Sequence, residues 1–132
     1  MDKETKSLIK AYIEKAQEKL KTAAGLVKDG SYDDAVSRAY YSAFHAASAL
    51  LLTEGLATET HRGLLNIFGL HFVKTGKIDK KFARFLSNLK DDREAGDYEA
   101  FSTIDKQVAE KALGEATEFL KEIEKILARY LN

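Results

Sequence analysis

The sequence predicts an all-α fold: an antiparallel bundle of four to five amphipathic helices, formed by one domain over residues 1–132. Three observations support this prediction. The chain contains no proline, the residue that helix interiors exclude most strongly. Apolar residues recur at spacings of three and four along successive segments, which is the period of a helix with one buried side. Hydrophobic residues make up 45% of the chain, enough for the core of one domain.

The first two helices follow from this periodicity. The apolar stripe runs through residues 3–28, where an Asp-Gly pair ends the first helix. Ser31 is predicted to cap the second helix, with Asp34 three residues later as an acidic variant of the capping box. The second helix is expected to end near residues 52–54. Its many alanines and serines would let another helix approach closely.

The second half of the chain predicts two or three more helices. One is expected over about residues 60–73, and a shorter one over about 79–94. The segment around Gly96 is less regular and is expected to be a loop. Ser102, followed three residues later by an aspartate, repeats the capping pattern and predicts a long last helix over 102–130. The two long terminal helices are expected to frame the others.

Composition excludes several classes of function. The chain has no cysteine, so disulfides, thiolate zinc sites and cysteine nucleophiles are excluded. The first residues, MDKETKSLIK, contain no apolar core of a signal peptide, and no segment approaches the roughly 18 apolar residues of a membrane span. The chain is therefore expected in the cytoplasm and away from membranes. Its 21 basic and 21 acidic residues argue against a generic nucleic-acid-coating protein but allow a local basic site.

The densest polar cluster lies on the second helix. Arg38 and His45 are seven residues apart, about 20° off two full turns, so they share one side of the helix. Tyr41 and Ser42 lie between them at helix-neighbour spacing. A guanidinium can hold phosphate oxygens and an imidazole can move protons, so this strip could bind or cleave a phosphodiester. The alternative is structural: both side chains satisfy only neighbouring carboxylates and carbonyls.

The run SRAYYSAFHAASALL at 37–51 closely resembles the corresponding helix of HEPN-domain proteins, in particular the small stand-alone prokaryotic group. The resemblance continues at His61, at the FVKTG segment 72–76, at the DREAGDY segment 92–98, and in a last helix that carries Phe119. It covers nearly the whole chain. The motif at 37–51 is fairly specific, and the other segments support it.

The resemblance implies a helical bundle that dimerises, and often a metal-independent endoribonuclease paired with a minimal nucleotidyltransferase. The signature of the active members is an arginine, four to six residues, then a histidine. Arg38 to His45 fits it literally. Arg93 fits by its place late in the bundle, but Tyr98 stands where the histidine is expected. Either the acid/base partner is missing and the domain binds without cleaving, or Tyr98 is a site of nucleotidylation by the partner.

The remaining histidines predict no metal site. His61 is interpreted as a helix-start residue that could join Arg38 or Tyr41 in a polar network, and His71 as a surface residue. No cofactor is expected. The candidate catalytic residues are Arg38, His45 and Arg93. The candidate nucleotide- or RNA-binding residues are Arg38, Tyr41, His45, His61, Arg93 and Tyr98.

Three hypotheses of function follow. The first is a homodimeric HEPN protein that associates with nucleotide or RNA, as the HEPN half of a nucleotidyltransferase–HEPN toxin–antitoxin pair. The second is an active endoribonuclease toxin, in which Arg38 or Arg93 stabilises the charge on phosphorus and His45 moves protons. The third is a non-catalytic structural or interaction domain.

Overall fold

The first two helices form a hairpin around Gly30, whose positive φ of 78° suits the tight turn. The computed structural model describes residues 1–131, so Asn132, the last residue of the predicted domain, lies outside the described residues. Helix α1 spans Lys3–Lys28 as predicted, and α2 spans Tyr32–Leu52. The predicted capping box at Ser31 is wrong, because its side chain makes no capping hydrogen bond. Its backbone has ψ near 70°, outside the extended region typical of a capping residue.

Helix α3 spans His61–Phe68 and continues into a π-helical turn, η1, over Gly69–Val73. Thr60 caps α3, since its side-chain oxygen accepts a hydrogen bond from the backbone N–H of Gly63 at 2.9 Å. The predicted helix over 60–73 is therefore present, but its period changes at residue 69. The cap fixes where α3 begins, and this sets the place of His61.

Helix α4, Lys80–Tyr98, is longer than predicted. Gly96 lies within the helix, so the expected loop at this position is wrong. The reason is tertiary: a Cβ added at Gly96 would stand 3.4 Å from the backbone of Asp33 and from the side chain of Val36. The missing side chain lets the end of α4 lie close against the start of α2, and this contact favours helix where local propensity does not.

Helix α5 spans Lys106–Leu131 and begins later than predicted. Asp105 makes the contact expected of a capping residue, since its carboxylate accepts from the backbone N–H of Val108 at 2.9 Å. Ser102 does not cap the helix. Its hydroxyl donates to the carboxylate of Asp33 and ties the connecting segment to the start of α2.

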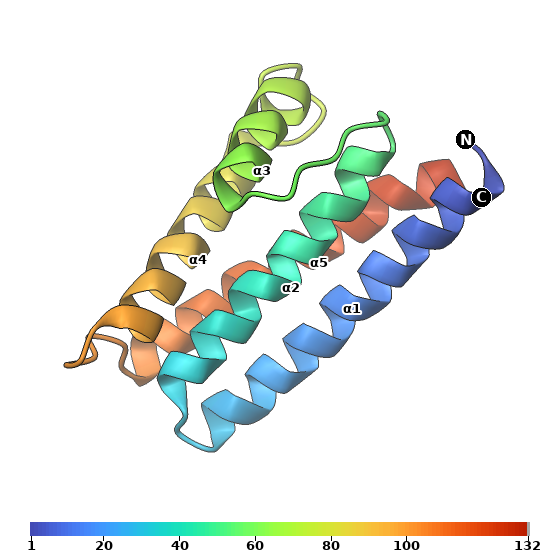
Figure 1. Ribbon diagram of the computed structural model, residues 1–132. Helices are drawn as coiled ribbons and strands as arrows, with labels where there is room; N and C mark the ends of the chain where they lie inside the picture. Colours follow the sequence, from blue (N-terminus) through green and yellow to red (C-terminus); the bar gives the residue numbers. More distant parts are fainter. Residues whose placement is uncertain (132) are drawn as a thin grey trace.

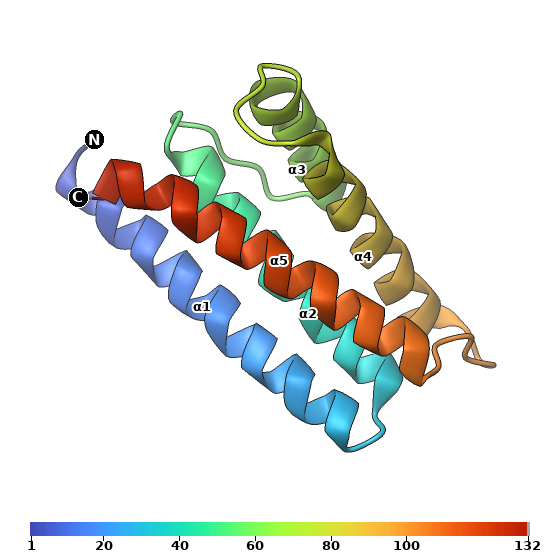
Figure 2. The ribbon, with the colours of Figure 1, turned by 180° about the vertical axis from the view of Figure 1, so that it is seen from behind.

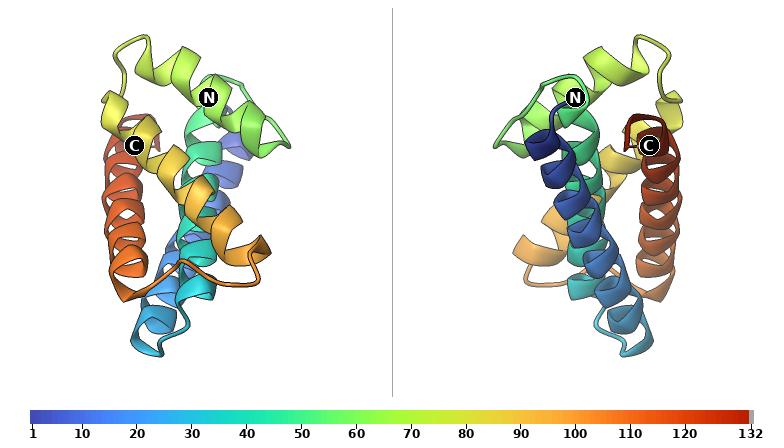
Figure 3. Two further views of the ribbon diagram at one scale, coloured as in Figure 1. Left: turned by 90° about the vertical axis from the view of Figure 1, so that its left-hand side faces the viewer. Right: turned by 90° about the vertical axis from the view of Figure 1, so that its right-hand side faces the viewer.

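Helix α2 is the central element of the bundle (Figure 1). It packs against α1, α4, α5 and α3, while α1 and α5 also contact each other. Successive long helices α1, α2, α4 and α5 run in alternating directions, and both ends of the described chain lie at the same end of the bundle (Figures 1 and 2). Short α3 and η1 cross over that end (Figure 3).

One face of the bundle is formed by α1, α2, the start of α3 and the end of α4, with α5 behind them (Figures 1 and 3). We call it the front face. The interior of α2 is lined by small side chains, which lets its neighbours approach: Ala35, Ala39, Ala43, Ala46, Ala47 and Ala49.

The described residues confirm the predicted all-α bundle, with five α-helices and no strand between residues 1 and 131. None of the helices in this range has the length and apolar character needed to cross a membrane.

Candidate functional site

A buried arginine marks the candidate site. Arg93 is only 9% exposed, although it lies near the end of α4. Its guanidinium carbon lies 5.3 Å from the ring centre of Tyr40 and 5.5 Å from that of Tyr41. One terminal nitrogen donates to the hydroxyl of Tyr41 at 3.4 Å and to the carboxylate of Asp97 at 3.2 Å. The Nε–H is buried and has no acceptor among the described residues.

Arg93 remains a cation in this setting. Burial acts to lower the pKa of its guanidinium, but Tyr41, Tyr98 and Asp97 act in the opposite direction, and the net pKa lies above its ordinary value. Asp97 does not cancel the charge fully, because the long contact leaves its carboxylate partly in solvent, with 31% of the side chain exposed. The site therefore holds a positive charge with unused donor capacity.

The second polar group of the site is His61, at the start of α3. The hydroxyl of buried Tyr40 lies 2.5 Å from His61 Nδ1. Burial raises the pKa of Tyr40 well above its usual range, so this hydroxyl keeps its proton. Burial, with Arg93 and Lys90 nearby, lowers the pKa of His61. In the tautomer that carries its proton on Nε2, the neutral His61 ring accepts from the Tyr40 hydroxyl at Nδ1 and presents a second donor near Arg93; in the other tautomer Nδ1–H donates to the hydroxyl.

His45 lies on the other side of α2, against α1. Its ring stacks on Tyr12, with centroids 6.1 Å apart and planes at 19°. Its Nδ1 is buried without a partner in the described chain. Burial is the main cause that lowers the pKa of His45 to about 4, and the charges of Lys15 and Lys19 add to it. His45 is therefore an uncharged ring at neutral pH.

Tyr41 connects the two regions. Its ring centre lies 6.3 Å from that of His45 and 6.0 Å from that of His61. Tyr12, His45, Tyr41 and His61 thus form a continuous row of half-buried rings across α2, which we call the aromatic row. Arg93 lies at its α4 end.

The residues of the predicted strip on α2 differ in burial and in their contacts. Arg38 is exposed, and its side chain makes no hydrogen bond or ion pair with residues 1–131. Ser42 is buried and donates to the backbone carbonyl of Ala16 at 2.7 Å, so its hydroxyl holds α1 to α2 and is not free for a ligand. Tyr98 is 75% exposed at the end of α4, and His71 is on the surface as predicted.

Two contributors to the site were not predicted from the sequence. Tyr40 lies in the core, but its hydroxyl reaches His61, which no local pattern could predict. Asp97 follows Arg93 by four residues, a spacing that makes helix neighbours and could have revealed the pair.

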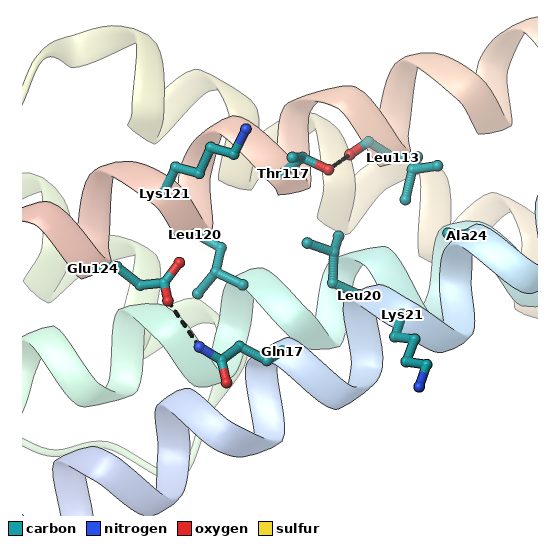
Figure 4. Close-up of a pocket in the computed structure, with 9 residues that line it drawn as sticks. All are labelled: Gln17, Leu20, Lys21, Ala24, Leu113, Thr117, Leu120, Lys121 and Glu124. Atoms are coloured by element: carbon teal, nitrogen blue, oxygen red, sulfur yellow. Dashed lines mark hydrogen bonds between the residues drawn. The ribbon is translucent and has the colours of Figure 1, made fainter.

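A hollow of the surface lies elsewhere, between α1 and α5 (Figure 4). Leu20, Leu113 and Leu120 line it, and Gln17 donates across its edge to Glu124 at 2.8 Å. It contains none of the predicted site residues. Lys21, Lys121 and Glu124 also line it, but none of these three is buried. The buried cation at Arg93, whose Nε–H has no acceptor in the described chain, marks the better candidate site. Within residues 1–131, no three His, Asp or Glu side chains are grouped closely enough to hold a metal ion.

Comparisons with known proteins place these features in a family. The HEPN domain matches residues 9–126. The chain is 39% identical to the protein of Methanocaldococcus jannaschii named "Putative toxin MJ0605", over 99% of this chain and 97% of that protein. It is 35% identical to a UPF0332 protein of Thermotoga maritima, over 94% of each. The crystal structure of TT1696 from Thermus thermophilus has the same fold, with a TM-score of 0.76 at 21% identity over 90% of this chain and 98% of that one.

Proposed function

The chain belongs to the HEPN family, and we propose that it is a toxin-like member whose Arg93 centre binds a phosphate of RNA. Two relatives from M. jannaschii carry the word toxin in their names, and each aligns with nearly the whole chain. The family match supports a toxin-like role. RNA as the ligand is our proposal and rests on the chemistry of the site.

The observation that carries the proposal is that Arg93 is a buried cation whose Nε–H donor has no acceptor within residues 1–131. Burying a cation is costly, and a buried N–H without an acceptor costs about 1–3 kcal/mol more. A buried arginine with a purely structural role would donate its N–H groups to acceptors of the protein. Here Nε makes no such bond within residues 1–131, and the contact to Tyr41 is long, at 3.4 Å. A phosphate would supply the strong acceptors that the guanidinium lacks.

His61 favours binding over cleavage. We assign His61 the tautomer in which Tyr40 donates to Nδ1, so the free Nε2 carries a proton and can donate to a phosphate oxygen. The same tautomer has no lone pair with which to remove the proton of a ribose hydroxyl. His45 cannot replace it at Nδ1, since that atom is buried. Tyr98 stands in place of the family histidine, so this position supplies no imidazole.

The partners are part of the proposal. We propose a homodimer and a minimal nucleotidyltransferase as the partner protein, as the family resemblance implies, and a cytoplasmic location. The exposed phenol of Tyr98 is accessible for nucleotidylation by such a partner. Phe101, 92% exposed in the segment after α4, adds apolar surface next to it.

Fluorescence anisotropy with labelled single-stranded RNA tests the RNA proposal. We expect Arg93→Met to weaken binding at least about 100-fold, which corresponds to the loss of a charge-assisted, multidentate contact. Arg84→Met is the matched control, since Arg84 is an exposed arginine on the same helix. Equal affinities of the Arg93→Met variant and the wild type would refute the proposal.

A second arm separates binding from cleavage. Wild type and the Arg38→Ala, His45→Ala and Arg93→Ala variants are incubated with mixed RNA in a chelator. We expect the wild type to leave the RNA intact. Metal-independent cleavage by the wild type, lost in these variants, would replace the binding proposal with an endoribonuclease, and the pattern of loss would locate its site.

A further inference from the structure

The aromatic row does not end at the Arg93 centre but crosses α2 to a second group of cations. Lys15 and Lys19 lie one turn apart on α1, three and seven residues after Tyr12, so they share the side of α1 whose Tyr12 ring stacks on His45. Burial is the main cause that lowers the pKa of His45, and the charges of these two lysines add to it. Arg38 lies on α2 two turns before His45, on the same side of the helix. No carboxylate of residues 1–131 comes within ion-pair distance of these three cations.

We propose that Lys15, Lys19 and Arg38 form a second phosphate subsite, and that the ligand is a single strand of RNA that crosses the front face from this subsite to Arg93. The inference rests on the proposed function and names its substrate class. Proteins that bind single strands combine a positive track for the backbone with aromatic side chains on which bases stack. Here the aromatic row lies between the two cationic ends.

The charges of α1 are divided between its two sides. Lys15 and Lys19 share the side of α1 that carries Tyr12, whose ring stacks on His45. Lys10, Glu14 and Lys21 line the hollows on the α5 side instead. Within the described chain, Glu18 lies on α1 between Lys15 and Lys19 but forms no ion pair with either lysine. The two lysines are therefore available to a phosphate, as a local nucleic-acid site requires in a chain without net charge.

The size of the track sets the length of the ligand. Arg93 is on α4 and Lys15 on α1, with α2 between them, so the ends are separated by two helix spacings of roughly 8–10 Å each. At about 3.4 Å per stacked nucleotide, the strand must contain roughly five nucleotides to reach both ends. A mononucleotide can fill only one subsite.

The rings of the row are placed to receive bases. Tyr12, His45 and Tyr41 are each partly exposed, and Tyr12 and His45 already stack with each other. The uncharged state of His45 suits this role, because a neutral ring stacks without competing with the cations for phosphate. Stacking is tolerant of base identity, so the proposal expects little sequence preference.

The test compares binding of uridine monophosphate with that of a single-stranded RNA of about eight nucleotides. Variants are Lys15→Gln/Lys19→Gln and, as a matched control from the other side of the same helix, Lys10→Gln/Lys21→Gln. We expect the first pair to weaken RNA binding about ten-fold, to lower the salt slope by about 1.4, and to leave mononucleotide binding unchanged. The control pair should retain wild-type affinity for both. Resonances of the Tyr12 and His45 rings should shift on addition of RNA and not on addition of mononucleotide.

The inference is overturned if the wild type binds the mononucleotide as tightly as the RNA, or if the two lysine pairs behave alike. It is also overturned if Lys15→Gln/Lys19→Gln changes self-association, measured by light scattering, in place of RNA affinity, since the face would then be a protein interface. In each case a loss of binding in Arg93→Met would still support the proposed function. Absence of any RNA binding by the wild type would instead refute the proposed function itself.

Discussion

Replacing Arg93 by methionine separates a binding arginine from a structural one. Methionine keeps a long side chain of similar reach but removes the charge and the donors. If Arg93 is retained for a ligand, its loss should abolish binding and change the free energy of unfolding little. If Arg93 holds the fold together, the same change should be strongly destabilising.

The structure gives the expected size of the change in stability. The variant loses a partly exposed ion pair with Asp97, worth about 0.5–1 kcal/mol, and two cation–π contacts of about 0.5–1 kcal/mol each. It also removes a buried N–H without acceptor, which costs the wild type about 1–3 kcal/mol. The terms largely cancel, to within about 2 kcal/mol. Breaking a fully buried ion pair would cost about 3–5 kcal/mol, but Asp97 keeps access to water.

Urea denaturation followed by circular dichroism measures this difference. At a slope of about 1–3 kcal/mol per molar, a change of up to about 2 kcal/mol moves the midpoint by at most about 2 M at the lowest slope and about 0.7 M at the highest. Arg93→Lys should fold equally well yet bind RNA poorly, since an ammonium lacks the planar donor fork. A loss of about 4 kcal/mol or more in Arg93→Met would refute the reasoning and assign Arg93 a structural role.

Three further predictions follow from single contacts. Because burial lowers the pKa of His45 to about 4, folding favours the neutral ring. The contribution of this ring to the free energy of unfolding is therefore complete above pH 6.5 and falls by about 1–3 kcal/mol as the pH drops towards 4. Urea midpoints of the wild type should show this fall, and those of His45→Gln should lack it. Gly96→Val should destabilise the protein by about 1–3 kcal/mol, because the added side chain pushes α4 away from α2. Gly114→Ala, in open space on α5, should stabilise it by up to about 1 kcal/mol. Thermal unfolding compares the two variants, and equal effects would contradict the contact at Gly96. Tyr40→Phe should remove the hydroxyl that donates to His61 Nδ1, and ¹⁵N spectra of the His61 ring should then lose the bias towards the Nε2–H tautomer. An unchanged spectrum would show that Tyr40 does not determine the tautomer of His61.

Features that depend on neighbouring residues were predicted well. The bounds of α1 and the starts of the helices near residues 60 and 79 involve residues within one helical turn of each other, so their residue types carry the information. The failures arose where distant contacts decide. The sequence treats Gly96 as a break, but its contact with the start of α2 keeps it helical. Ser102 resembles a cap, but it bonds instead to Asp33 across the bundle.

By itself, the sequence determined the class of fold, the HEPN resemblance and the candidate site residues, because helical periodicity and motifs depend only on residues that are close together in the chain. Only the tertiary structure decided which of those residues meet. Tyr40 and His61 are separated by 21 residues, and Tyr41 and Arg93 by 52, yet each pair shares a hydrogen bond. Such contacts depend on how α2, α3 and α4 pack, and packing depends on the shape of the whole core. Spacing in the sequence places Arg38 and His45 on one side of α2, but packing decides which cation is buried, and that cation is Arg93.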